Sequence, residues 1–387
     1  MSEAVTTSPS GHQPRIKRSH VTVWALWDWG SAAFNAVMIT FVFGTYLASE
    51  SFGADDRGTS WLAAGNAIAG VIIALTAPVI GQRADNDGRR TMWLGINTGL
   101  VIATMAACFF VQPQESYLLL GVILLSAGNV FFEFAGVQYN AMLVNIATQS
   151  TIGRISGLGW GAGYLGGIFL LLLAYVGFIS GDAHWFGITN DDAMNIRMVA
   201  VFAALWFLAF SLPILIVMRN RETTGRQPTA RRVSIVRSYR QLIDTIVELW
   251  KHRRNTFWFF VASAIFRDGV GAVFAYGAIL GTTVYGVDPG QILFFGIAAN
   301  VVAAAGAFFG GLFDDRFGPK RIIVVSLLGL IVSAVIIFVQ NGTLAFWIWG
   351  LFLCFFVGPV QSSSRAFLGR LTTAQTAGEM YGLYATT

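Results

Sequence analysis

The chain has 387 residues, of which 55% are apolar and 12% are charged, and its formal net charge is +5. A soluble globular domain carries roughly 25% charged residues, so an ordinary soluble fold is excluded. The basic residues lie in loops on one side of the predicted spans, so the positive charge does not indicate binding to nucleic acid.

Apolar windows of about 20 residues recur along the chain, and each is long enough to cross a ~30 Å hydrocarbon core. They predict an all-α polytopic membrane protein. Cys108 and Cys354 both lie inside spans and form neither a disulfide framework nor a metal-ligand spacing. A polar tail, 1–20, precedes the spans, and it contains no short apolar core, so we expect no cleaved signal peptide. The ten complete spans are predicted at 21–49, 59–80, 91–112, 117–145, 154–179, 197–218, 256–285, 289–312, 322–339 and 344–366.

The distribution of lysine and arginine sets the predicted orientation. Nearly all of them fall in the N-terminal tail, in alternate loops and near the end of the last span, where Arg365 and Arg370 are counted. Arg57 and Arg197 fall on the opposite side. By the positive-inside rule the N-terminus is cytoplasmic, and we expect the protein in a bacterial plasma membrane.

The longest loop, 219–255, divides the chain into a six-helix bundle (21–218) and an incomplete second bundle (256–387). It is expected to begin as a flexible linker between Arg219 and Pro228. An apolar stripe then follows at helical spacing with basic residues beside it, which predicts an amphipathic helix on the anionic inner leaflet of the bilayer. A helix that binds a soluble partner is the alternative. The stripe consists of Tyr239, Leu242, Ile243, Ile246, Val247 and Trp250.

A short charged segment occurs in both halves of the chain. Gly81–Arg90 (GQRADNDGRR) and Gly311–Arg321 (GLFDDRFGPKR) each lie between two long apolar runs, and both are predicted as loops. Two such segments at matching places indicate a duplicated pair of helical bundles. The alignment pairs Gly81 with Gly311, Asp85 with Asp315, Gly88 with Gly318 and Arg90 with Lys320.

The repeat continues beyond the fourth and tenth spans at a constant offset of 225 residues. Ala141–Leu143 matches Ala366–Leu368, and Gly153–Leu158 matches Gly378–Leu383. In this register the chain reaches the first residues of an eleventh helix. We therefore expect a truncated chain, with roughly 60 further residues in a complete twelve-helix protein.

Four charged residues, Asp28, Glu133, Arg267 and Asp268, lie well inside the first, fourth and seventh spans. Charges inside hydrocarbon are costly and are usually functional or paired. We expect a central path whose carboxylates bind a solute or carry a proton. The alternative is static buried ion pairs, such as Arg267 with Glu133 or Asp28. Polar residues at helical spacing extend the expected path: Ser31 and Asn35 beside Asp28; Asn129, Gly136 and Asn140 beside Glu133; and Gln361, Ser364 and Arg365 in the tenth span.

Glycines inside the spans predict close helix packing, because small residues let helix backbones approach each other in lipid. Three of them spell G-x-G-x-x-G, but no strand precedes them, so a dinucleotide site is not expected. The glycines of the fifth and eighth spans are Gly157, Gly161, Gly163, Gly166, Gly167, Gly306 and Gly310.

The spans contain no histidine, and the chain has no H-E-x-x-H, G-x-S-x-G or phosphate-binding Walker motif. We therefore expect no metal, no cofactor and no enzymatic activity, and transport driven by ATP hydrolysis on this chain is excluded.

The two charged segments resemble the cytoplasmic motif of the major facilitator superfamily, G-x-x-x-D-R-x-G-R-R. Asn86 stands where that motif has a basic residue. The resemblance implies two six-helix bundles, with helices one, four, seven and ten around a central cavity, that rock to give alternating access. The matching residues are Gly81, Asp85, Gly88, Arg89 and Arg90 in the first copy and Gly311, Asp315, Arg316, Gly318 and Lys320 in the second.

The resemblance also implies a latch between the bundles. Asp85 would accept hydrogen bonds from the start of helix eleven, here Gly378 to Tyr384. Its negative charge would also be stabilised by the positive end of that helix's dipole. Asp315 would meet the start of helix five, Gly153 to Gly157, in the same way. Such a latch would close the cytoplasmic side and favour an outward-open state.

Three further stretches resemble the vacuole-effluxer branch of the superfamily, whose fungal members export amino acids from vacuoles during autophagy. They are Trp24–Trp29, Ser156–Gly167 and Asp268-Gly269. Arg267 departs from the branch, which often has an uncharged polar residue there.

We therefore expect secondary transport of a small polar solute, with amino acids as candidates, coupled to protons or another ion. A multidrug exporter is one alternative, suggested by 12 Trp and 32 Phe residues. A non-transporting membrane scaffold or an inactive remnant is the other.

Overall fold

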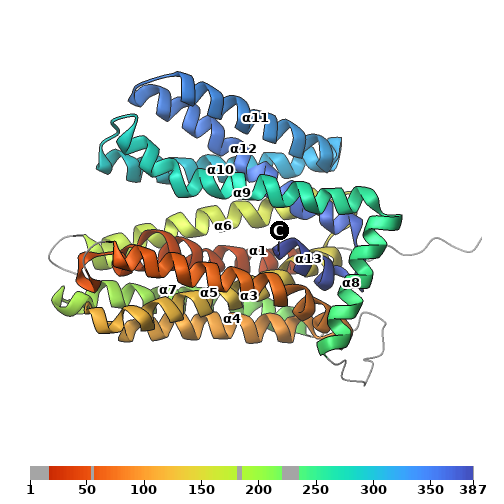
Figure 1. The fold of residues 1–387 in the computed structure, drawn as a ribbon, viewed down its shortest axis with the longest axis horizontal. Helices are drawn as coiled ribbons and strands as arrows, with labels where there is room; N and C mark the ends of the chain where they lie inside the picture. The colour runs from red at the N-terminus through yellow and green to blue at the C-terminus, as the bar shows by residue number, and fades with distance from the viewer. Residues whose placement is uncertain (1–16, 54–55, 181–184, 220–234, 387) are drawn as a thin grey trace, which may run out of the picture.

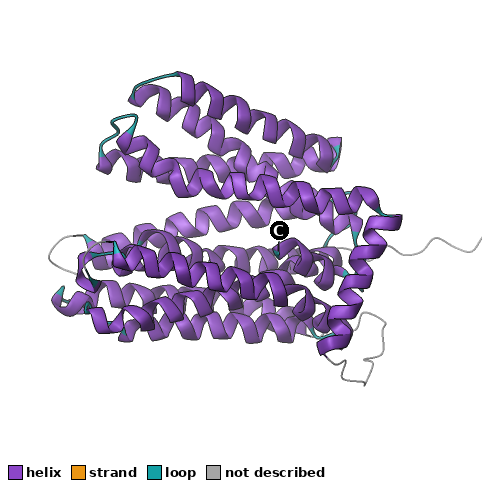
Figure 2. Cartoon of the chain, in the orientation of Figure 1, coloured by secondary structure: helices purple, strands orange, loops and turns teal. Residues whose placement is uncertain are grey.

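The computed structural model describes residues 17–53, 56–180, 185–219 and 235–386, and all regular structure in these residues is helical (Figure 2). The long helices are α1 (Arg18–Ala32), α3 (Arg57–Asp87), α4 (Arg90–Ala107), α5 (Leu118–Ile146), α6 (Ile152–Ala174), α7 (Met194–Met218), α8 (Ile235–His252), α9 (Arg254–Thr283), α10 (Pro289–Phe317), α11 (Pro319–Val339) and α12 (Thr343–Leu371). The shorter helices are α2 (Phe43–Leu47), α13 (Ala377–Ala385), the π-helices η1 (Ala33–Phe41) and η5 (Tyr175–Ile179), and the 3-10 turns η2 (Glu50–Phe52), η3 (Cys108–Phe110), η4 (Glu115–Tyr117), η6 (Trp185–Gly187) and η7 (Asp191–Ala193).

Ten helical segments in the described part of the chain are long and apolar enough to cross a membrane. The predicted all-α polytopic fold is therefore confirmed. The first segment joins α1, η1 and α2, so one span contains a stretch of π-helix. A π-helix turns less per residue than an α-helix, which changes the face that later residues of this span present.

The spans form two groups (Figure 1). The helices α1 and α3 to α7 pack on one another in the first group, and α9 to α12 lie together in the second. The two groups meet where α6 packs on α10 and α12. The short helix α13 comes last in the described chain but packs on α3 and α5 of the first group.

The two charged segments are largely helical, so their prediction as loops was wrong. α3 continues to Asp87 and ends at Gly88, which has a φ of 64°. α10 continues to Phe317 and is followed by Gly318, with a φ of 88°. Glycine adopts positive φ without steric cost, so these residues and not the first charges end the helices. We call the end of the molecule that carries these two segments the basic end.

The helix α8 crosses the ends of the spans at the basic end (Figure 1). Leu242 and Leu249 are buried, and the Tyr239 hydroxyl donates to the carbonyl of Leu75 in α3 at 2.9 Å. Ile243 and Trp250 remain exposed. The expected apolar stripe is thus divided between the bundle and the surroundings. Of the expected flexible linker, only Arg219 lies within the described residues.

Close contact between α1 and α6 depends on Gly166. A Cβ atom at this position would lie 2.4 Å from the carbonyl oxygen of Trp29 in α1, so the two backbones could not keep their separation. The core beside it is aromatic, with Trp24 and Trp27 fully enclosed. The charged residues of the first group therefore lie on helices whose backbones are closely packed.

We predict that Gly166→Ala lowers the free energy of unfolding by about 1–3 kcal/mol, the usual effect of overpacking a core. Thermal unfolding of the purified protein in detergent measures it. Gly99→Ala on α4 is the matched control, because a Cβ there meets nothing within 4 Å. Equal melting temperatures for the two variants would contradict the packing role of Gly166.

Candidate functional site

Arg365 of α12 lies between the two groups of helices, and its side chain is 4% exposed. Its Nη1 atom lies 3.3 Å from Asp28 Oδ2 of α1 and 3.3 Å from Asn140 Oδ1 of α5. Its Nε donates to the hydroxyl of Ser156 in α6 at 2.9 Å, and its Nη2 donates to the carbonyl of the same residue at 2.6 Å. A single guanidinium from the second group is thus bonded to three helices of the first.

Three aromatic rings surround this guanidinium. The Arg365 Cζ lies 4.8 Å from the ring centroid of Trp24, 5.7 Å from that of Tyr139 and 5.4 Å from that of Trp160. Trp24 and Tyr139 stack with their centroids 4.4 Å apart, and the Trp24 indole donates to the Tyr139 carbonyl at 3.0 Å. Ring faces attract a cation and exclude water, so the cage stabilises the charge where hydration is absent.

The partner of Asp28 is Arg365, and the alternative pairing with Arg267 was wrong. Arg267 instead donates to the carbonyl of Tyr384 in α13 and lies 4.3 Å from the centroid of its ring. Arg365 was expected near the end of the last span, but α12 continues to Leu371 and encloses its side chain. A charge near a helix end looks the same in sequence whether its side chain points to water or to a neighbouring helix.

Glu133 of α5 is partly buried and forms no ion pair among the residues that the structure describes. Arg267 of α9 is the oppositely charged group that acts on Glu133, so a second electrostatic attraction links the two groups of helices. Asp268 is exposed on α9 and lies outside this arrangement.

Among the other polar residues of the expected path, three form side-chain hydrogen bonds and two lie away from Arg365. Ser31 and Ser364 donate to carbonyls of their own helices, whereas Gln361 accepts from the Tyr164 hydroxyl of α6 at 2.9 Å. Asn35 is exposed on η1, and Asn129 is partly buried away from the Arg365 contacts. Sequence reasoning did not single out Trp24, Tyr139, Ser156, Trp160 or Tyr164 as site residues, although all except Tyr139 lie in the two aromatic and glycine-rich stretches.

At the basic end, Asp85 joins α3 to α13. Its carboxylate accepts the backbone N–H groups of Gly378 and Glu379, each at 3.0 Å. Arg90 holds the same carboxylate from the start of α4, with Nε and Nη2 at 2.9 and 2.5 Å, and also donates to the carbonyl of Ala374. The carboxylate therefore lies at the N-terminus of α13, where the helix dipole favours negative charge.

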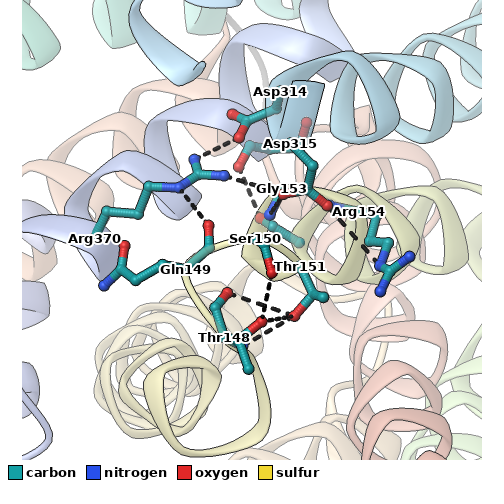
Figure 3. A network of polar contacts seen from close by, with 11 residues as sticks. Thr148, Gln149, Ser150, Thr151, Gly153, Arg154, Asp314, Asp315 and Arg370 are labelled. Atoms are coloured by element: carbon teal, nitrogen blue, oxygen red, sulfur yellow. Dashed lines mark hydrogen bonds and ion pairs between the residues drawn. The ribbon is translucent and has the colours of Figure 1, made fainter. Parts of the chain in front are cut away.

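Asp315 makes the equivalent contacts at the start of α6 (Figure 3). It accepts the N–H groups of Gly153 and Arg154, at 2.8 and 3.1 Å, at the start of α6. Arg370 of α12 donates to Asp315 at 3.0 Å, to Asp314, and to the carbonyl of Gln149 at 3.2 Å. Lys320, which aligns with Arg90, is exposed, so the basic partner comes from a different helix in this copy.

The comparisons with known sequences agree on one family. The sequence model of the Major Facilitator Superfamily matches residues 30–387. The chain is 25% identical over 364 residues to the uncharacterised MFS-type transporter YxiO of Bacillus subtilis, covering 93% of this chain and 83% of the relative. It is 26% identical over 260 residues to Autophagy-related protein 22-1 of Aspergillus fumigatus, covering 60% of this chain and 41% of that protein.

Solved structures share the fold. The proton:xylose symporter XylE superposes with a TM-score of 0.71 at 15% identity, over 95% of this chain and 85% of that one. The transporter FucP in its outward conformation superposes with a TM-score of 0.68 at 14% identity, over 95% and 89% of the two chains.

We predict that Arg365→Gln lowers the free energy of unfolding by about 3–5 kcal/mol, because it leaves Asp28 buried without a partner. The double variant Asp28→Asn/Arg365→Gln recovers most of this loss. Thermal unfolding in detergent measures both. Arg57→Gln is the control, since the Arg57–Glu115 pair is half exposed and exposed pairs contribute little. No recovery in the double variant would contradict the pairing.

Proposed function

Because the chain is a membrane transporter that belongs to the Major Facilitator Superfamily, we propose that it moves a small polar solute by alternating access, driven by a proton gradient. The observation that carries the proposal is the ion pair between Asp28 and Arg365, which joins the two groups of helices inside the span region. The basic end is taken as cytoplasmic, in keeping with its lysine and arginine content.

Opening of the basic end removes Arg365 from its partners. The guanidinium belongs to the second group, whereas Asp28, Asn140 and Ser156 belong to the first. A buried charge left without its partner costs about 3–5 kcal/mol. Separation of the two groups with Asp28 still ionised is therefore unfavourable. Protonation of Asp28 removes that cost, which ties the movement of the two groups to a proton.

The same charges suit a zwitterionic solute such as an amino acid. When Asp28 is neutral, Arg365 is free to bind the solute carboxylate, and guanidinium–carboxylate pairs are strong and directional. Glu133, which has no ion pair among the described residues, offers a carboxylate for the solute ammonium. The resemblance to the vacuole-effluxer branch supports this class of solute.

The contacts of Asp85 and Asp315 act as two latches on the cytoplasmic side. Asp85 joins α3 to the start of α13, and Asp315 joins α10 to the start of α6. Both contacts are formed in the structure. This arrangement favours an outward-open state. Release of both latches is then part of each transport cycle.

Proteoliposomes loaded with a panel of amino acids and imposed pH gradients test the transport proposal. We predict that Asp28→Asn and Glu133→Gln each abolish accumulation driven by the gradient, because the proton-carrying carboxylate or the ammonium site is lost. Asp268→Asn is the control: it changes an exposed carboxylate and retains accumulation driven by the gradient. Wild-type rates and pH dependence in the first two variants would refute the coupling. An absence of any solute flux in the wild type would support the scaffold alternative.

The latches are tested by cysteine labelling. Ser364→Cys places a thiol at a fully buried position of α12 near the basic end. In this background Asp85→Ala is expected to increase the labelling rate, since α13 loses the acceptor of two N–H groups. Asp87→Ala is the control, because Asp87 is exposed on the last turn of the same helix. Unchanged labelling in Asp85→Ala would rule out the latch.

A further inference from the structure

Glu379 is a buried carboxyl inside the first latch. It lies in the first turn of α13, and it is 9% exposed. Its backbone N–H donates to Asp85, and its side chain lies beside Gln82 of α3 and Thr245 of α8. Three helices therefore meet at this carboxyl group.

Two oxygen atoms at this point lack a donor. Among the described residues, Glu379 Oε1 and Gln82 Oε1 are buried and have no hydrogen-bond partner. Both are acceptors when Glu379 is ionised, and a buried acceptor left unsatisfied costs about 1–3 kcal/mol. A proton on Glu379 removes the buried charge, and it turns an oxygen atom that only accepts into a donor.

The charges around Glu379 also favour a proton. The two that act on it are Asp85 of α3 and Glu248 of α8, and both are carboxylates. The one arginine held in the latch, Arg90, is bonded to Asp85 and to the carbonyl of Ala374. Burial raises the pKa of Glu379 above its ordinary value, although contacts with Thr245 and Gln82 oppose the shift.

We propose that Glu379 is a proton-binding site of the cytoplasmic latch, in which the protonated carboxyl lets α13 stay packed against α3 without a further buried charge. When the proton leaves to the cytoplasm, three carboxylates face one another and the latch weakens. The site senses cytoplasmic pH and does not depend on the identity of the solute or on the role of Asp28.

The direction of the pH effect follows from linkage. The pKa of Glu379 is raised in the closed latch and returns toward its ordinary value when the carboxyl reaches water in the open state. Closure therefore binds a proton. The closed state is favoured below the raised pKa and is lost as the cytoplasmic pH rises through it.

Distances between the two groups of helices test the proposal without a transport assay. Asp87→Cys and Arg316→Cys place spin labels at exposed positions of α3 and α10, while Cys108 and Cys354 are buried and do not compete. Double electron–electron resonance in nanodiscs gives the open fraction. We expect it to rise with pH in this labelled parent and to stay low at every pH after Glu379→Gln. A parental pH dependence in Glu379→Gln would overturn the proposal.

Two further variants fix the roles of the neighbours. Glu248→Gln removes one repelling carboxylate but keeps Glu379, so the transition persists with its midpoint moved to lower pH. Gln82→Leu removes a contact that lowers the pKa of Glu379, so the midpoint moves to higher pH. A midpoint that stays at its parental value in both variants would contradict the assignment of the transition to Glu379.

Discussion

The structure depends on the burial of one guanidinium. Arg365 is placed where water does not reach, so its charge and donors must be satisfied by protein groups. The groups that satisfy it, Asp28, Asn140 and Ser156, all belong to the other half of the molecule. The charge of Arg365 is therefore compensated only when the two halves of the molecule come together. A change in the charge of Asp28 acts directly on the contact between them.

On this account two carboxyl groups bias the same movement in opposite directions. Protonation of Asp28 releases Arg365 and favours opening at the basic end, whereas protonation of Glu379 strengthens the latch there. The two groups lie on different helices, α1 and α13. A proton from outside and a proton from the cytoplasm would thus have opposite effects, which gives the cycle a direction without any change in the solute contacts.

The sequence was sufficient for the spans and the duplication, because each depends on a local pattern or on an internal repeat. The contacts of Asp85 and Asp315 were expected only from the resemblance to the major facilitator superfamily. It was insufficient for the pairing of Arg365 with Asp28, since these residues are 337 positions apart and only tertiary packing brings them together. The exposure of Asn35 was also missed. A stretch of π-helix begins at Ala33, so the α-helical spacing from Asp28 no longer holds.

The protonation of Asp28 can be measured directly by infrared difference spectroscopy of the reconstituted protein as the basic end opens. We predict a protonated carboxyl band that appears with opening and is absent in Asp28→Asn. The same band at full intensity in Asp28→Asn would contradict the claim that a proton on Asp28 separates the two halves.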